Sequence, residues 1–94
     1  MDDIVWTEDA LQDLDDIAAY IALDNPKAAE NIVRRIGEVV ASLSFFPRIG
    51  RAGRIADTRE LVIDDTPYIA VYRLRDRIEV LSIYHGARKW PESF

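Results

Sequence analysis

Residues 77–91, with the sequence RIEVLSIYHGARKWP, combine a strand-like run with a cluster of basic and aromatic residues. Residues 77–85 are rich in β-branched and other apolar side chains, which predicts a strand. The strand opens into a segment with the only histidine, His85, one of the two tryptophans, Trp90, and a basic pair between them. These residue types handle phosphates, stack on bases or anchor protein interfaces. The end of this strand is therefore the first place to look for a functional site.

Two more strands are predicted before it, at residues 59–63 and 68–74. Residues 64–67, with the sequence DDTP, predict a turn between these two strands because Asp, Thr and Pro favour tight turns. Residues 75–76 predict a second turn, although they lack the glycine that is usual in two-residue hairpins. Three strands joined by short turns predict an antiparallel meander.

Helical patterns dominate the first half of the chain, after a short strand predicted at residues 3–6. Thr7 is a good N-cap for a first helix that ends near Asp24. The Asn-Pro pair at residues 25–26 starts a second helix that runs to about Phe45. The apolar stripes of the two helices are Leu11, Leu14, Ile17, Ala18 and Ile21, and Ala29, Ile32, Val33, Ile36, Val39, Val40 and Leu43. Helices joined so tightly form an antiparallel hairpin.

The order of these elements predicts the fold class. Residues 47–54, with the sequence PRIGRAGR, predict a loop that leads from the second helix into the meander. The order β-α-α-β-β-β predicts an α+β fold, an antiparallel sheet with the helical hairpin packed on one face. Ninety-four residues are too few for two separate cores, so we expect a single domain over residues 1–94.

Charge is distributed unevenly along the chain. The net charge is −5, but residues 1–46 contribute −7 and residues 47–94 contribute +2. Eight of the nine basic residues in the second half are arginines. This asymmetry indicates an anionic partner for the second half, or arginines that pair with Asp57, Glu60, Asp64 and Asp76. A protein that coats DNA nonspecifically would be more basic overall.

Several classes of protein are excluded by composition. Without cysteine and with one histidine, the chain predicts no metal site, and it has no glycine-rich phosphate loop, so we expect no cofactor. The sequence begins with MDD, which is acidic where a signal peptide would be basic, and no apolar run reaches membrane-spanning length. We therefore expect a cytoplasmic protein.

A series of motifs resembles the RelE/ParE toxin superfamily in both order and spacing. The motifs are Trp6–Leu14, Tyr20–Ile21, Pro26–Ala29, Pro47–Arg51, Arg59–Ile63, Tyr68–Arg73 and Val80–Arg88. The resemblance implies the toxin of a type II toxin–antitoxin pair, which inhibits growth or stabilises a plasmid and is neutralised by a cognate antitoxin, ParD-like or another small protein. RelE-like members cleave messenger RNA on the ribosome without a metal. ParE-like members inhibit DNA gyrase.

His85 is the residue on which the choice between these targets depends. If the chain is a nuclease, His85 is the candidate acid or base, and Arg51, Arg59 and Arg73 are the candidate cations. However, the nucleases that it resembles place an arginine where this chain has Ile69. Strand alternation predicts that His85 shares a face with Ile83 and Leu81, and with Ile69, Val71 and Arg73 of the neighbouring strand. That face is a poor phosphate site, so we interpret His85 as a structural residue bonded to a backbone carbonyl or a carboxylate.

The favoured interpretation is a ParE-like gyrase inhibitor that needs no catalytic residue. The alternatives are a RelE-like ribosome-dependent endoribonuclease and a non-toxic module that only binds an antitoxin. The candidate target-binding residues are Arg88, Lys89, Trp90 and Phe94, although Trp90 could instead cover apolar surface of the sheet. The candidate antitoxin-binding residues are Arg51, Arg54, Arg59 and Arg73. We expect Trp6, Tyr68 and Tyr72 to belong to the core.

Overall fold

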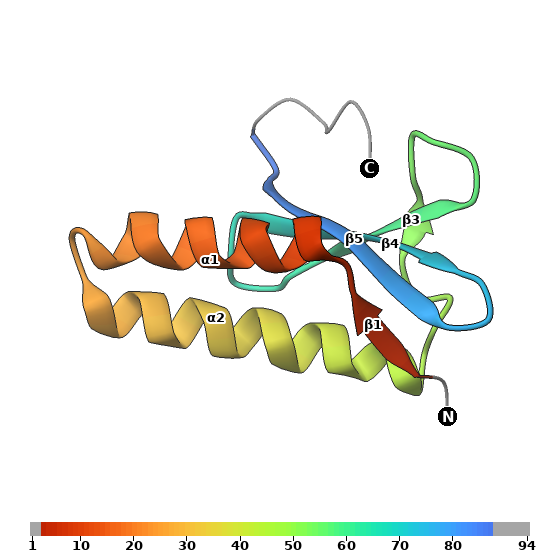
Figure 1. Cartoon of the computed structure of the whole chain (residues 1–94), viewed down its shortest axis with the longest axis horizontal. Helices are drawn as coiled ribbons and strands as arrows, with labels where there is room; N and C mark the ends of the chain where they lie inside the picture. Colours follow the sequence, from red (N-terminus) through yellow and green to blue (C-terminus); the bar gives the residue numbers. More distant parts are fainter. Residues whose placement is uncertain (1–2, 88–94) are drawn as a thin grey trace.

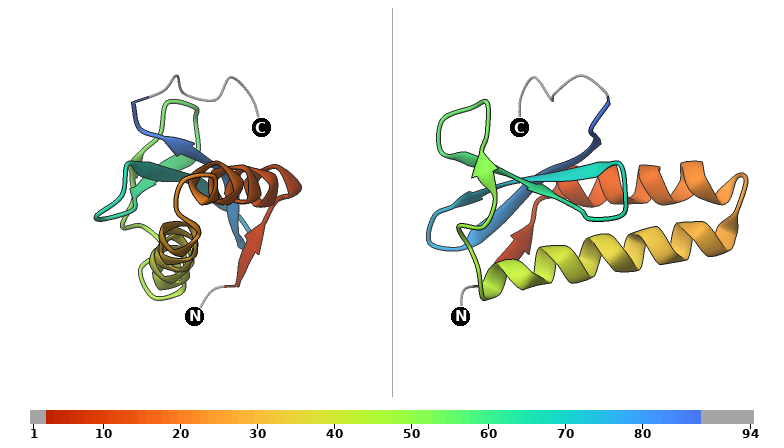
Figure 2. Two further views of the ribbon diagram at one scale, coloured as in Figure 1. Left: turned by 90° about the vertical axis from the view of Figure 1, so that its left-hand side faces the viewer. Right: turned by 180° about the vertical axis from the view of Figure 1, so that it is seen from behind.

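The computed structural model describes residues 3–87. In chain order they form β1 (Ile4–Trp6), α1 (Glu8–Ala22), α2 (Pro26–Ala41), the 3-10 helix η1 (Ser42–Ser44), β2 (Arg51–Ala52), β3 (Thr58–Val62), β4 (Tyr68–Leu74) and β5 (Ile78–His85). The two long helices form an antiparallel hairpin on one side of a twisted sheet, and the tip of the hairpin extends beyond the sheet (Figures 1 and 2). The predicted α+β class, with its helical hairpin on one face, is confirmed.

The predicted helix caps are present. Thr7 Oγ1 accepts a hydrogen bond from the backbone N–H of Ala10 at 3.1 Å, and Asn25 Oδ1 accepts one from Ala28 at 3.0 Å. These side chains satisfy backbone donors that have no partner within a helix's first turn. The second helix is α-helical to Ala41 and continues as η1 to Ser44, close to the predicted end at Phe45.

The strand order within residues 3–87 is β1-β5-β4-β3-β2. The last four strands in sequence pair antiparallel, whereas β1 pairs parallel with β5, with Ile4 opposite Ile78. The sheet is therefore mixed, and not wholly antiparallel as predicted, because the first strand of the chain lies beside the last and runs in the same direction. The segment predicted as a loop contains β2, whose residues Arg51 and Ala52 pair with Glu60 and Arg59.

A bulge in β5 decides which side chains share a face. Val71 lies opposite Ser82 and Tyr72 lies opposite Val80, so Leu81 is the extra residue of the bulged strand. Beyond the bulge, Tyr68 lies opposite His85. His85 therefore shares the helix-covered face with Tyr68.

The predicted neighbours of His85 need correction in part. Ile83 packs in the same cluster as Tyr68, as predicted, but Leu81 and Val71 form a separate small cluster with Tyr84. Ile69, which lies opposite Tyr84, and Arg73 also belong to the face turned away from the helices. The prediction of a shared face was wrong because strand alternation alone reveals neither the bulge nor the cross-strand register.

The main core lies between the helical hairpin and the sheet. Its buried members are Ala10, Ile36, Val40, Leu43, Leu61, Ile63, Tyr68, Ala70, Tyr72, Ile78, Val80 and Ile83. Trp6 is partly buried against this cluster. The prediction that Trp6, Tyr68 and Tyr72 belong to the core is confirmed.

Tyr72 fixes the path of the chain between α2 and β2. Its fully buried phenol donates a hydrogen bond to the carbonyl of Pro47 at 2.8 Å and accepts one from the N–H of Gly50 at 2.9 Å. Burial raises the pKa of Tyr72 above its usual 10.0, against the opposing effects of the Gly50 bond and of Arg59. A Cβ at Gly50 would lie 2.7 Å from the Tyr72 ring, so this position requires glycine.

Neither helix within residues 3–87 combines the length and apolar character that a membrane-crossing segment needs.

Candidate functional site

His85 lies at the rim of a pocket between α1 and the end of the sheet. The pocket has a volume of about 420 Å³. Helix α1 contributes Asp13, Asp16, Ile17 and Tyr20, and the sheet contributes Tyr68, Ile83, Tyr84 and His85. Two carboxylates and three tyrosines thus surround the single histidine, and none of the lining residues within 3–87 is an arginine or a lysine.

The imidazole of His85 is held from two sides. Its Nδ1 accepts a hydrogen bond from the backbone N–H of Ala87 at 3.1 Å. The ring also meets Tyr68 edge to face, with the centroids 5.6 Å apart at 81°. The histidine is bonded to a backbone N–H, and not to the carbonyl or carboxylate that the sequence suggested.

Asp13 connects α1 to the outer edge of β5. Its Oδ2 accepts hydrogen bonds from the N–H of Ile83 and from the hydroxyl of Ser82, both at 3.0 Å. Nearer the start of α1, the N–H of Thr7 donates to the carbonyl of Val80 at 3.1 Å. These bonds occupy backbone groups of β5 beyond its short pairing with β1, and they hold α1 alongside the strand (Figure 1).

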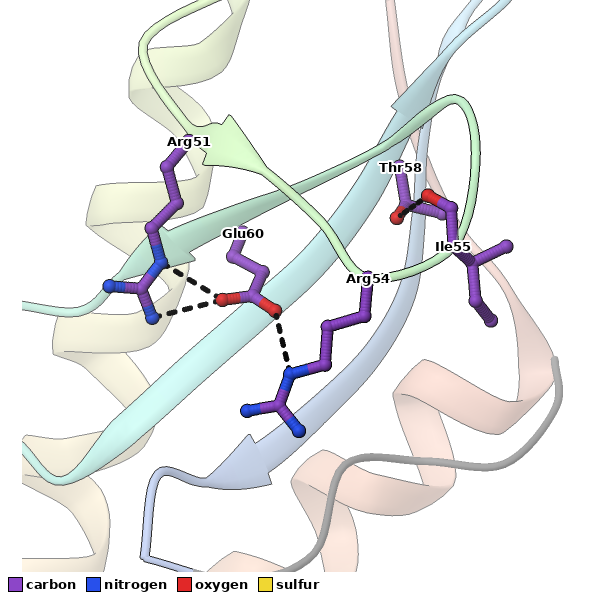
Figure 3. Close-up of polar contacts among 5 residues, drawn as sticks. All are labelled: Arg51, Arg54, Ile55, Thr58 and Glu60. Atoms are coloured by element: carbon purple, nitrogen blue, oxygen red, sulfur yellow. Dashed lines mark hydrogen bonds and ion pairs between the residues drawn. The ribbon is translucent and has the colours of Figure 1, made fainter.

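A different cluster lies on the sheet face turned away from the helices. Arg51 places its Nε and Nη2 each 2.9 Å from Oε1 of Glu60, and Arg54 Nε lies 4.0 Å from Oε2 (Figure 3). The Glu60 side chain is only 5% exposed, whereas those of Arg51 and Arg54 are 61% and 65% exposed. The two cations therefore neutralise a buried carboxylate, and we name Arg51, Arg54 and Glu60 the Glu60 cluster.

The other two predicted arginines are also engaged within the fold. Arg73 forms a short ion pair with Glu79 across the β4–β5 hairpin. Arg59 Nη1 donates to the backbone carbonyls of Gly50, at 2.9 Å, and Arg48, at 3.2 Å. The structure thus brings Arg51 and Arg54 together, and it places Arg59 and Arg73 in separate arrangements.

The histidine and the predicted cations do not form one site. Arg51 and Arg54 converge on Glu60, and Arg73 lies on the same open face, whereas His85 lies on the helix-covered face. Arg59 is on the helix-covered face as well, but it is bonded to the carbonyls of Arg48 and Gly50 and does not line the pocket of His85. Among the described residues, the polar groups that line the pocket with His85 are carboxylates and phenols. A phosphate at His85 would meet negative charge, which is the opposite of what a phosphoryl transition state requires.

An apolar groove crosses the outer side of the helical hairpin. The groove has a volume of about 580 Å³, and its lining is Ala18, Ala19, Ala22, Pro26, Ala29, Glu30, Val33 and Arg34. Beside it, at the tip of the hairpin, the apolar side chain of Leu23 is 83% exposed. Sequence reasoning missed this groove, since Ala18, Ala29 and Val33 were assigned to core-facing stripes. The signal that could have found it is the concentration of alanine in both helices at the turn.

The predicted target-binding residues Arg88, Lys89, Trp90 and Phe94 lie outside the described residues. Within residues 3–87, no three side chains of a type that binds metals are grouped so that they could hold an ion. The geometry thus offers an acidic aromatic pocket, an internally paired arginine cluster and an apolar groove.

Comparison with known proteins places this arrangement in a family. The family model of the ParE toxin of the type II toxin–antitoxin system parDE matches residues 4–90. The chain belongs to the ParE toxin family. Its place there confirms the predicted membership of the RelE/ParE superfamily.

Relatives of this ParE-family toxin are similar over nearly their whole length. Y4kP of Sinorhizobium fredii, a toxin by name, is 48% identical over 89 residues, which are 95% of this chain and 93% of that protein. Toxin RelE2 of Caulobacter vibrioides is 37% identical over 89 residues, 94% and 99% of the two chains. A solved structure of a chromosomal ParDE toxin–antitoxin system from P. aeruginosa has a TM-score of 0.81 at 30% identity, covering 90% of this chain and 96% of that one.

Proposed function

We propose that this ParE-family toxin acts in the cytoplasm as an inhibitor of DNA gyrase and is neutralised by a cognate small antitoxin. The environment of His85 is the observation that favours gyrase inhibition over RNA cleavage. Its pocket contains Asp13 and Asp16 and no cation from the described part of the chain. A metal-free nuclease needs its acid or base beside cations that stabilise the phosphorane-like transition state.

Engagement of the arginines strengthens the argument against cleavage. To clamp a phosphate, Arg51 would have to leave Glu60, and Arg73 would have to leave Glu79. Leaving a carboxylate as buried as Glu60 without its partner carries a free-energy penalty. Arg59 forms hydrogen bonds to backbone carbonyls and pairs with no carboxylate within residues 3–87, so it would be the easiest of these arginines to recruit to a phosphate. However, it lies on the opposite side of the sheet from the Glu60 cluster.

The segment that contacts gyrase is, in this proposal, the end of the chain. Arg88, Lys89, Trp90 and Phe94 have the composition of an interface hot spot, with cationic and aromatic side chains close together. Truncation after Ala87 should abolish gyrase inhibition and leave the melting temperature nearly unchanged. A large fall in melting temperature would instead assign this segment to the core.

The antitoxin, in this proposal, lies over the helical hairpin and the sheet. An amphipathic helix that buries apolar side chains in a groove is a recurring mode of peptide recognition, and the groove between α1 and α2 suits it. The exposed parts of Arg51, Arg54 and Arg73, which share the open face of the sheet, suit an acidic extension of the same partner, whereas Arg59 lies on the opposite face. Co-expression with the antitoxin should raise the soluble yield and give a complex that survives in salt.

One pair of assays with the purified chain tests the proposal. Gyrase supercoiling should be inhibited in proportion to toxin concentration, and mRNA on programmed ribosomes should remain intact. The antitoxin should relieve the inhibition at about one equivalent per toxin. Cleaved mRNA with unaffected supercoiling would replace the proposal with a RelE-like nuclease, and no effect in either assay would leave an antitoxin-binding module.

A further inference from the structure

The acidic pocket beside His85 has a feature that gyrase inhibition does not explain. Among residues 3–87, no arginine or lysine lies within ion-pair distance of Asp13 or Asp16. The Glu60 cluster on the other face shows the contrasting case, in which a carboxylate is paired with cations from its own chain. Asp13 and Asp16 accept hydrogen bonds from Ser82, Ile83 and Gln12, but no cation from the described residues neutralises their charge.

The negative potential extends along the helix that forms one wall. Helix α1 carries five carboxylates, and its first turn holds Glu8 and Asp9 while its last turn holds no basic residue. Asp13, Asp16 and Tyr20 follow one another at helical spacing, so their side chains lie on one side of α1.

The remaining walls suit the body of a long cationic side chain. Ile17 and Ile83 provide apolar surface for methylene groups, and Tyr68, Tyr84 and Tyr20 provide aromatic surface. Aromatic faces attract ammonium and guanidinium groups, and more strongly where water is excluded. A volume of about 420 Å³ also lies within the usual range of ligand pockets, which is roughly 300–1,000 Å³.

The location of the pocket identifies the partner that could fill it. Ile17 and Tyr20 line the pocket, and their neighbours Ala18 and Ala19 line the apolar groove. The two cavities therefore lie on adjacent flanks of α1. A single segment bound along this helix would reach both.

We infer that the pocket formed by Asp13, Asp16, Tyr20, Tyr68, Tyr84 and His85 receives an arginine or lysine side chain of the antitoxin. The apolar groove would supply affinity, and the pocket would supply specificity, because a partner without the cation would leave two carboxylates uncompensated at the interface. This inference rests on the proposed antitoxin partner. It specifies that one antitoxin side chain at this interface is cationic, which membership of the family does not specify.

The first experiment uses a small probe, so that it does not depend on the identity of the antitoxin. Nα-acetyl-arginine methylamide is titrated into the full-length chain to millimolar concentration while backbone amide resonances are followed by NMR. The uncharged citrulline analogue is the matched control. The arginine compound should shift resonances of residues that line the pocket, and the citrulline compound should not; equal shifts, or none, would overturn the inference.

The second experiment uses two neighbouring aspartates of α1. Asp16→Asn removes a pocket charge but keeps a carbonyl to accept the 2.8 Å hydrogen bond from Gln12. Asp15→Asn is the matched control, because Asp15 is also exposed on α1 but does not line the pocket. Asp16→Asn should weaken antitoxin binding about tenfold, the usual size of one charge-assisted contact, and Asp15→Asn should change it less than about twofold.

The outcomes separate this inference from the proposal on which it rests. Tight antitoxin binding that is equally insensitive to both substitutions would overturn the inference and leave the toxin–antitoxin function standing. A chain that binds no antitoxin would overturn the proposed function as well. Stronger binding of the arginine compound after Arg88→Gln and Lys89→Gln would assign the pocket to the chain's own C-terminal segment, and would also overturn the inference.

Discussion

The Glu60 cluster and the His85 pocket bring charged side chains together in opposite ways. In the cluster, a carboxylate that is 5% exposed is paired with two arginines contributed by β2 and the loop after it. In the pocket, two carboxylates from α1 face tyrosines and the imidazole of His85. The charges of the first region are compensated within the described structure, whereas those of the second are not.

This difference shows that a count of charged residues does not locate a binding site. The arginine-rich second half of the sequence suggests an anion site, but Arg51, Arg54, Arg59 and Arg73 form contacts within the fold. The acidic helix suggests a solvated surface, but it forms one wall of a pocket. Substitutions in the first region should therefore change stability, and substitutions in the second should change binding.

Gly50→Ala should have the largest effect on stability, because it changes the backbone position immediately before Arg51 of the Glu60 cluster. The added methyl group would lie 2.7 Å from the Tyr72 ring and 2.9 Å from the carbonyl oxygen of Glu60. Overpacking of this kind should lower the free energy of unfolding by about 2–3 kcal/mol in urea denaturation. Gly37→Ala is the control, since nothing lies within 4 Å of its Cβ, and it should raise stability by about 0.5–1 kcal/mol.

Tyr72→Phe should have the next largest effect, because it removes the phenol that joins Pro47 and Gly50. Two backbone groups would lose their partner, so the expected loss at neutral pH is about 1–3 kcal/mol. An unchanged unfolding curve would mean that water replaces the phenol without cost.

The same residue predicts how stability depends on alkaline pH. The pKa of Tyr72 is raised in the folded state, so its contribution is fully present below pH 10.0 and is lost as pH rises through the folded-state pKa. Between these values the unfolded chain has lost the proton that the folded chain keeps, and unfolding is favoured. The free energy of unfolding should therefore fall less steeply above pH 10 in Tyr72→Phe than in the parent chain; parallel profiles would contradict this.

Arg51→Met tests directly whether the arginines of the Glu60 cluster neutralise the charge of Glu60, and it should reduce stability less than Tyr72→Phe does. Glu60 would keep Arg54 but lose the closer of its two cations. Because the Arg51 side chain is 61% exposed, solvent screens the pair, and the expected loss is about 1 kcal/mol. Arg75→Met, in the exposed β4–β5 turn, is the matched control and should change stability by less than about 0.5 kcal/mol.

His85→Ala should have the smallest effect on stability, about 0.5–1 kcal/mol, from loss of the Tyr68 ring contact and of the bond to Ala87. Growth inhibition should persist, because gyrase inhibition needs no general acid or base. If growth inhibition disappears while the circular dichroism spectrum and antitoxin binding are unchanged, the nuclease interpretation should replace the one proposed here.

Local signals predicted the elements well. Thr7 and Asn25 have short polar side chains that satisfy nearby backbone donors, so the starts of both helices could be read from neighbouring residues. The strand predicted at residues 68–74 agrees with β4 in both its bounds. Element type depends mainly on contacts that are close in sequence.

Relations between distant segments could not be predicted in the same way. The face occupied by His85 depends on the bulge at Leu81 and on the pairing with Tyr68, and both are set by long-range packing. No local signal shows that α1 lies alongside β5, so the approach of Asp13 to Ile83 went unpredicted. The candidate cations were identified as residues, but their pairing with Glu60 and Glu79 required the tertiary structure.

The parallel pairing of β1 with β5 has a consequence for synthesis of the protein. Ile4 finds its strand partner only when Ile78 has been made, and Thr7 and Asp13 likewise wait for backbone groups of Val80 and Ile83. A nascent chain can form its helical hairpin early, but its sheet cannot be completed until residues 78–83 have left the ribosome. Until then, the apolar side chains by which the hairpin packs on the sheet stay uncovered.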